Sequence, residues 1–288
     1  MGWWMKIVLR KGWTIAGAAA LAVLGVGMVL LAFTDRSGAS TQSSLTVNLP
    51  SPVTDRIFGA PEARGRPIIV IDAGHGGRDP GATSVSGEVH EKDLTLALAK
   101  ELRDDLVKRG RVRVAMTRED DRYLTLDERA AVARRLDAAM FVSLHMDSAP
   151  NPLARGATVY SLSDVASDLE AARLAQTENG AEDSKASSSP LQAMLSDLAM
   201  RTEMSASADL AERLVNKSAG RFELRPNPHR FASFHVLRRA DARGVLFEAG
   251  YISNLGDEVL LRSPEQRAKI ALALAQAIET DVAARARR

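Results

Sequence analysis

A small group of residues have metal-binding side chains at the positions where an α/β protein builds its sites. His75, His145 and Glu248 end expected strands or follow them closely, and Glu91 opens an expected helix. Zinc in hydrolases takes three protein ligands of the His and carboxylate type and leaves one position for water. His75, Glu91 and His145 would make such a set, with His90 in the adjoining loop as a competing ligand.

Each of these residues alone has an ordinary structural explanation. A single histidine is commonly structural or exposed, and an acidic residue at a helix start interacts favourably with the helix dipole. The combination favours a metal site, because both histidines stand at strand ends beside small or acidic residues, in the runs GHG at 74–76 and HMD at 145–147.

The composition is that of an ordinary globular protein. Of 288 residues, 45% are hydrophobic, which allows one or two domains with a real core. The formal net charge is only +2, which gives no argument for nucleic acid as a partner. The sequence has no cysteine, so disulfides and a lipoprotein anchor are excluded and any metal must be bound by histidines and carboxylates.

A sheet is needed to bring the metal-binding residues together. The run IIVIDA at 68–73 is typical of a strand buried on both faces, and ligands in open α/β sheets bind beyond the carboxyl ends of such strands. Further strands are expected at 112–117, 139–144, 157–162 and 245–248, and helices at 91–109, at 124–136 and from Ser263-Pro264 onward. This alternation predicts an α/β fold with a mostly parallel sheet flanked by helices.

The first part of the chain is expected to lie outside this fold. Lys6, Arg10 and Lys11 precede an uncharged, largely apolar run at 12–34 that is long enough to span a bilayer. Residues 1–39 are therefore predicted to be a signal peptide or an uncleaved transmembrane signal anchor, and the basic residues before the run predict export of everything after it. Residues 40–65 are predicted to be a flexible linker and 66–288 the globular domain.

Taken in order, the runs IDAGHGG at 71–77, EKDL at 91–94, SLHMDSA at 143–149 and VLFEAGYISN at 245–254 strongly resemble a known family. It is the zinc-dependent N-acetylmuramoyl-L-alanine amidases of amidase type 3, which split peptidoglycan in bacterial cell division. The resemblance covers about 66–284. It implies zinc bound by His75, Glu91 and His145, with Glu248 as the catalytic acid/base. One departure is the run MDS at 146–148, where many relatives carry a small residue after the histidine.

The resemblance implies an exported, periplasmic hydrolase that remodels the cell wall and separates daughter cells, attached to the inner membrane if its signal is uncleaved. Its substrate would be the amide bond between N-acetylmuramic acid and L-alanine. Two alternatives stay open: a zinc peptidase that cuts within the stem peptide, and a wall-binding protein that has lost the chemistry. Retention of His75, Glu91, His145 and Glu248 argues against the second.

Residues 163–231 are predicted to be a helical insertion in the sheet, with helices at 164–178 and 191–217 and no strand. Relatives with a similar insertion are held inactive by a carboxylate at the open zinc position until a divisome activator removes it, and the resemblance implies the same here. Glu203 is the first candidate for this contact and Glu178 the second. The alternative is a helix pair that simply covers the core.

Overall fold

The computed structural model describes residues 55–180 and 190–286, with side chains assigned outside 190–199. The expected signal peptide or anchor and most of the expected linker lie outside the described residues. Among the helices within the described ranges, none combines the length and the apolar character needed to cross a membrane.

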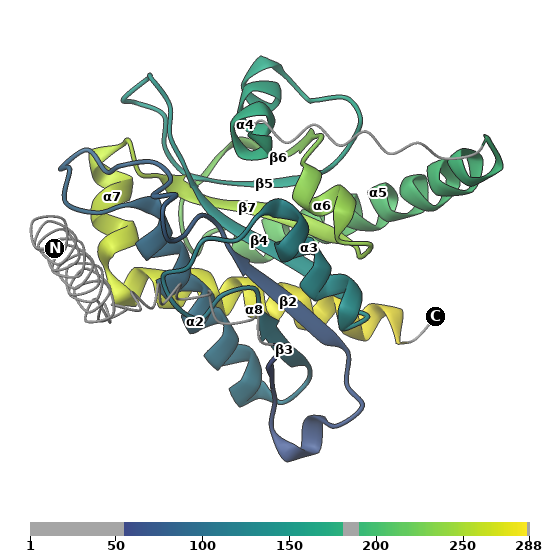
Figure 1. Cartoon of the computed structure of the whole chain (residues 1–288). Coiled ribbons are helices and arrows are strands. Elements are labelled where there is room, and N and C mark those ends of the chain that lie inside the picture. Colours follow the sequence, from purple (N-terminus) through teal and green to yellow (C-terminus); the bar gives the residue numbers. More distant parts are fainter. Residues whose placement is uncertain (1–54, 181–189, 287–288) are drawn as a thin grey trace, which may run out of the picture. The chain divides into compact units, whose positions relative to one another are not determined.

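The domain is built on a seven-stranded sheet (Figure 1). In spatial order the strands are β1 Ile57–Phe58, β3 Arg113–Met116, β2 Ile68–Ala73, β4 Met140–Asp147, β7 Gly244–Tyr251, β5 Ala157–Leu162 and β6 Leu224–Ala232. The pairs β2–β3, β2–β4, β4–β7 and β5–β6 are parallel, whereas β1–β3 and β5–β7 are antiparallel. Because β2, β4 and β7 are parallel neighbours, their carboxyl ends meet at one edge of the sheet.

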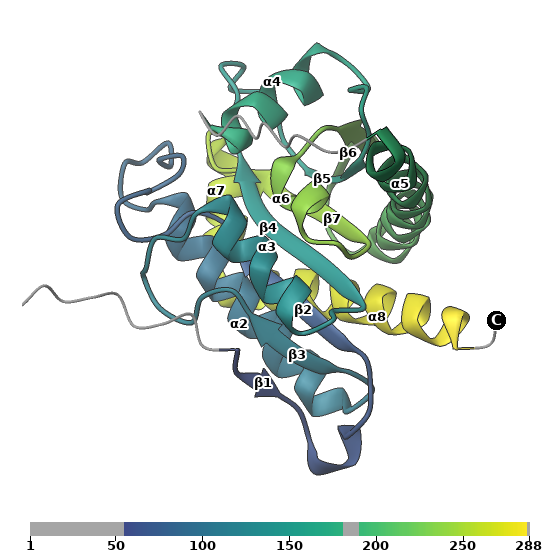
Figure 2. The same ribbon diagram turned by 45° about the vertical axis from the view of Figure 1, so that its right-hand side comes forward.

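Helices cover both faces of the sheet (Figures 1 and 2). One face packs against α2 Glu91–Arg109, α5 Pro190–Ser218 and α8 Pro264–Arg285. The other packs against α3 Leu126–Arg135, α4 Leu169–Asn179 and α6 His235–Arg239. The remaining elements are the 3₁₀ turn η1 Pro61–Ala63 and the helix α7 Leu255–Arg262. The predicted α/β class with a helix-flanked sheet is therefore confirmed.

Local sequence explains where the helices begin and end. Thr125 caps α3 in a reciprocal capping box with Glu128. α8 begins with Ser263 as N-cap and Pro264 in its first turn. α2 ends at Gly110, whose left-handed backbone lets its N–H bond back to the carbonyls of Leu106 and Val107.

Two strands lie where the sequence predicts none. β1 falls within the expected linker: Ile57 pairs with Ala115 and Phe58 with Val114, so folded structure begins before residue 66. A strand of two residues carries no periodicity by which to recognise it. β6 falls within 163–231, for which only helices are predicted; its prolines at 226 and 228 and its arginines at 225 and 230 hide the strand pattern.

The two predicted helices of the insertion differ in their packing. α4 begins at Leu169, five residues later than the expected start at 164, where Asp168 supplies the cap by accepting a hydrogen bond from the Ala171 N–H. α5 carries Leu210, Ala211 and Leu214 into the hydrophobic core, all fully buried. The second helix is therefore part of the core rather than an accessory to it.

Candidate metal centre

The sheet places three of the predicted site residues together at its carboxyl edge. His75 lies two residues beyond the end of β2, His145 near the end of β4 and Glu248 near the end of β7. His145 and Glu248 are direct partners in the β4–β7 register. The rings of His75 and His145 meet edge to face with their centroids 4.9 Å apart.

Glu91, the first residue of α2, joins the two histidines. One carboxylate oxygen, Oε1, lies 3.1 Å from His75 Nε2 and 3.1 Å from His145 Nδ1. The same oxygen accepts a hydrogen bond from the backbone N–H of Met146, and Oε2 accepts one from the N–H of Ala82. Backbone donors therefore fix both oxygens, and the side chain is almost fully buried.

The loop after β2 adopts a backbone that brings His75 into this cluster. His75 itself has φ 58°, a left-handed conformation that is uncommon for a residue with a side chain. A Cβ on Gly74 would stand 2.4 Å from Cε1 of His145, and one on Gly81 would stand 2.6 Å from Oε2 of Glu91. Glycine at these two positions is what lets the imidazoles and the carboxylate pack together.

Two buried arginines hydrogen-bond to the backbone of this loop, and no motif in the sequence points to them. Arg118 donates from Nε to the carbonyl of Ala73 and from Nη2 to that of Gly74. Arg129 donates to the carbonyls of Ala73 and His75. Arg129 also forms a buried ion pair of 2.9 Å with Asp72.

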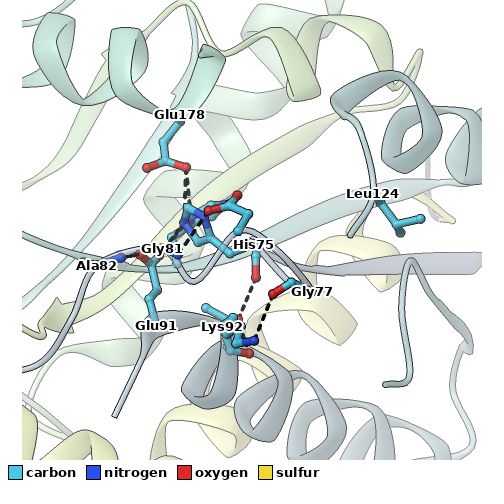
Figure 3. Close-up of polar contacts among 12 residues, drawn as sticks. His75, Gly77, Gly81, Ala82, Glu91, Lys92, Leu124 and Glu178 are labelled. Atoms are coloured by element: carbon cyan, nitrogen blue, oxygen red, sulfur yellow. Dashed lines mark hydrogen bonds and ion pairs between the residues drawn. The ribbon is translucent and has the colours of Figure 1, made fainter. Parts of the chain in front are cut away.

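A second carboxylate reaches the histidines from another helix. Glu178, in the last turn of α4, has Oε2 3.2 Å from His145 Nδ1 and 3.6 Å from His75 Nε2. In Figure 3, Glu178 lies above His75 and Glu91 lies below it. The ligand atoms of His75, His145 and Glu178 all lie within 4.8 Å of one another.

Glu203, the first sequence candidate for this contact, lies elsewhere. Burial and the nearby Asp241 raise the pKa of Glu203, and Arg243 and Arg285 partly offset this. Its charged neighbours are therefore these residues and not the histidines. Its helix α5 lies beside the opposite end of β7, where Ser207 accepts a hydrogen bond from the Gly244 N–H. Of the two predicted acids, the structure thus brings only Glu178 to the histidines.

These residues fit a tetrahedral cation. Ligand atoms about 2.0–2.1 Å from a zinc ion stand about 3.3–3.4 Å apart, and the contacts above span 3.1–3.6 Å. Nε2 of His75 is buried and makes no hydrogen bond to any described residue. Its other nitrogen, Nδ1, lies 2.9 Å from Asp79 Oδ2, a contact that orients the ring and directs the Nε2 lone pair at the cluster. Asp79 is a site residue that the sequence reasoning missed.

The charges in the cluster favour a cation. Burial would lower the pKa of His75, but Glu91, Asp79 and Glu178 together raise it to about 11. Burial would raise the pKa of Glu91, but the two imidazoles hold it well below its usual range. Burial raises the pKa of Glu178 more than the two imidazoles lower it, and repulsion from Glu91 and Asp79 raises it further.

Glu248 is buried beside the cluster. Neither of its carboxylate oxygens makes a hydrogen bond to any described residue. Burial raises its pKa well above the usual value, and repulsion from Asp147, Glu91 and Glu178 adds to the effect. A buried carboxyl group without partners costs several kcal/mol relative to water unless a function retains it. It lines, with His75, Glu91, His145 and Glu178, one cavity of about 1290 Å³.

Comparisons with known proteins agree with this geometry. Residues 69–280 match the family described as N-acetylmuramoyl-L-alanine amidase. The chain is 32% identical over 265 residues to N-acetylmuramoyl-L-alanine amidase AmiA of Escherichia coli K12, covering 89% of each protein. It is 33% identical over 224 residues to the probable N-acetylmuramoyl-L-alanine amidase AmiB of Haemophilus influenzae, covering 75% of this chain and 51% of that protein, so it spans about half of that relative's length. The solved structure of the amidase AmiC2 of Nostoc punctiforme superimposes with a TM-score of 0.57 at 28% identity, over 74% of this chain and 96% of that one.

Proposed function

The chain belongs to the N-acetylmuramoyl-L-alanine amidase family, and on that premise we propose that it hydrolyses the amide bond between N-acetylmuramic acid and L-alanine in peptidoglycan. One observation carries the proposal beyond family membership. A carboxylate oxygen of Glu91 lies 3.1 Å from a nitrogen of each imidazole, in a cavity that also holds Glu248. The carboxyl group of Glu248 makes no hydrogen bond to any described residue. Such a cavity combines a cation site with an acid/base.

The metal of this proposal is zinc. His75 through Nε2, His145 through Nδ1 and Glu91 through Oε1 would hold it, a ligand set of the type found in zinc hydrolases. When bound, zinc supplies Lewis acidity: it polarises the amide carbonyl and makes water at the site more acidic. Asp79 keeps the His75 ring in the tautomer that leaves Nε2 free, and the arginines behind the loop keep its backbone in place.

Glu248 is the acid/base of the proposal. Its carboxylate takes a proton from the attacking water and passes it to the leaving nitrogen of L-alanine, a role worth roughly 10²–10⁴-fold in rate. Burial and the neighbouring carboxylates raise its pKa, which makes it a stronger base than an exposed glutamate. Its position opposite His145 in the strand register supports this assignment, because partners in a ladder project to the same face.

Helix α4 keeps this amidase at low activity in the proposal. Glu178 lies 3.2 Å from His145 Nδ1, where its carboxylate would compete with water and the amide carbonyl for the cation. An activator protein of the division machinery would bind the form in which α4 has moved away and so shift the population toward it. The predicted export signal supports a periplasmic enzyme that acts in wall remodelling and daughter-cell separation.

Purified sacculi test the activity directly. The chain loaded with zinc should release peptides that begin with a free L-alanine amine, detected by mass spectrometry. Chelation should stop the release and added zinc should restore it. Peptides cut within the stem would instead identify a peptidase, and absence of any release from the zinc-loaded chain with Glu178 replaced by Gln would contradict hydrolysis altogether.

A further inference from the structure

A second charged cluster is built around Arg225 and Glu170, which line the same cavity as the histidines. Arg225 donates from Nη1 to Oε1 of Glu170 at 2.9 Å and from Nη2 to Oε2 at 3.0 Å, a bidentate pair. The hydroxyl of Tyr251 donates to the same Oε1 at 3.0 Å and accepts from Arg225. Arg230 adds a further bond to Oε2 of Glu170 at 3.1 Å. Two guanidinium groups and a hydroxyl thus converge on one carboxylate.

An irregular bulge presents Arg225 to the cavity. In the β5–β6 ladder, Leu224 pairs with Ala157, but the next paired residue of β6 is His229, opposite Val159. Residues 225–228 therefore leave the ladder; the segment contains Pro226 and Pro228, which have no N–H to donate, and Asn227 has φ 54°. Bulges of this kind redirect side chains beside functional sites.

The two arginines depend on α4 and its cap for their carboxylate partners. Within the described residues, the carboxylates that form ion pairs with Arg225 and Arg230 are Glu170 and Asp168, and both belong to the start of α4 or its cap. The arginine side chains are only 14% and 11% exposed, whereas Glu170 is 41% exposed. Departure of α4 would remove the carboxylate partners of both arginines and leave the guanidinium group of Arg225 on the wall of the cavity without a carboxylate among the described residues.

The spacing of this cluster from the metal centre suits a peptide. Glu170 and Glu178 lie eight residues apart on α4, which corresponds to about 12 Å along a helix axis. An extended peptide covers about 12 Å in three to four residues. On the sheet, Tyr251 pairs with Asp147, two residues beyond His145, so both clusters lie along one path in the cavity.

We propose that Arg225, supported by Arg230 and Tyr251, is a binding subsite for a carboxylate of an acidic peptide substrate, and that Glu170 occupies this subsite while α4 is docked. The inference rests on the proposed amidase function, whose products are peptides. The two-pronged guanidinium geometry is the one that recognises carboxylates. α4 thus carries a carboxylate for each end of the substrate path: Glu178 at the metal centre and Glu170 at the subsite.

Two soluble N-acetylmuramoyl peptides that differ at one group test the subsite: one has a free carboxylate three to four residues from the scissile bond, the other a primary amide there. The full chain should cleave the free acid with a kcat/KM about 10- to 100-fold higher, mainly through KM, since this is what a charge-assisted bidentate hydrogen bond contributes. Arg225→Gln should cleave both peptides equally, and Arg225→Lys should show an intermediate preference.

Two further variants distinguish binding of a substrate carboxylate by Arg225 from a purely structural role of the Arg225–Glu170 ion pair. Glu170→Gln removes the competing carboxylate, so it should cleave the free acid faster and retain the preference. Arg135→Gln, a matched control that breaks an exposed arginine–carboxylate pair with Asp55, should behave as the unaltered chain. Equal changes on both peptides in Arg225→Gln and Glu170→Gln, or an unaltered preference in Arg225→Gln, would overturn the subsite while the amidase function stands. Cleavage of neither peptide by any variant would overturn both.

Discussion

Helices α2 and α4 each deliver a carboxylate to the same pair of imidazoles, but they are attached to the domain in different ways. α2 buries Leu94, Leu98, Leu102 and Leu106 against the sheet. Each fully buried leucine contributes about 1.5–3 kcal/mol. The buried positions of α4 are only the small residues Ala171 and Ala175, with Leu174 partly buried against the core. Its polar attachments are the ion pairs of Asp168, Glu170 and Glu178. Two hydrogen bonds of Asn179 add to these, one to the Ser233 carbonyl and one from the His235 N–H.

The two carboxylates also differ in their electrostatic surroundings. Glu91 is the first residue of its helix, at the positive end of the dipole, and accepts two backbone N–H bonds. Glu178 is in the last turn of its helix, at the negative end, and among the described residues its ion pairs are those with His75 and His145. We therefore propose that Glu91 is a permanent part of the site, whereas Glu178 leaves it together with α4.

Replacement of Glu91 should have the largest effect on zinc binding and on activity. Glu91→Gln is expected to weaken zinc binding by at least about 100-fold, because a charged ligand is lost, and hydrolysis of sacculi should fall to background. Zinc content after gel filtration is the measurement. Glu178→Gln is the matched control and should retain one zinc per chain. Equal zinc loss in both variants would contradict the distinction between the two helices.

Replacement of Glu248 should have the second-largest effect on activity. Glu248→Gln should retain zinc and fold, because the side chain makes no hydrogen bond that the described structure would miss. Turnover should fall by about 10²–10⁴-fold, the usual contribution of general acid/base catalysis. The measurement is the rate of peptide release at saturating sacculi, with zinc content measured on the same sample. A rate within a factor of three of the unaltered chain would assign proton transfer to another group.

A pair of leucines tests the packing difference between α4 and α5. Leu214→Ala removes a fully buried core side chain and should lower the free energy of unfolding by about 2–5 kcal/mol. Leu169→Ala, at the exposed start of α4, should change it by less than about 0.5 kcal/mol. Denaturant unfolding of both variants gives the comparison. Similar values for the two would mean that α4 is held to the domain as firmly as α5.

Release of the docked helix should give the smallest change. Glu178→Gln should raise the basal hydrolysis of sacculi by about tenfold, since loss of about 1.4 kcal/mol of docking free energy changes the open population by that factor. Initial rates at matched zinc content are the measurement. A rate equal to or below that of the unaltered chain would show that docked α4 does not inhibit hydrolysis.

The sequence predicts those parts of the site in which a functional side chain stands at the end of a strand that a run of apolar residues reveals. Runs of apolar residues predicted β2, β4 and β7, and the side chains at their ends lie together in the structure. Asp79, Arg118 and Arg129 could not be predicted, because their roles come from contacts across the fold: Arg129 holds the backbone of a residue 54 positions away. Glu203 is the first sequence candidate for the contact with the metal site and Glu178 the second, but the structure brings Glu178 to the histidines, for the same reason. The packing of α5 along β7 places Glu203 away from the histidines, and no local pattern of α5 reveals that packing.

The bulge in β6 has a consequence for association between copies of the chain. A sheet with an open edge can recruit a strand from another molecule and begin a fibre. β6 forms one edge of this sheet, and its bulge interrupts the row of N–H groups with Pro226 and Pro228. The opposite edge, β1, is only two residues long. Neither edge offers a continuous template, so the segment that presents Arg225 also protects the enzyme against edge-to-edge aggregation.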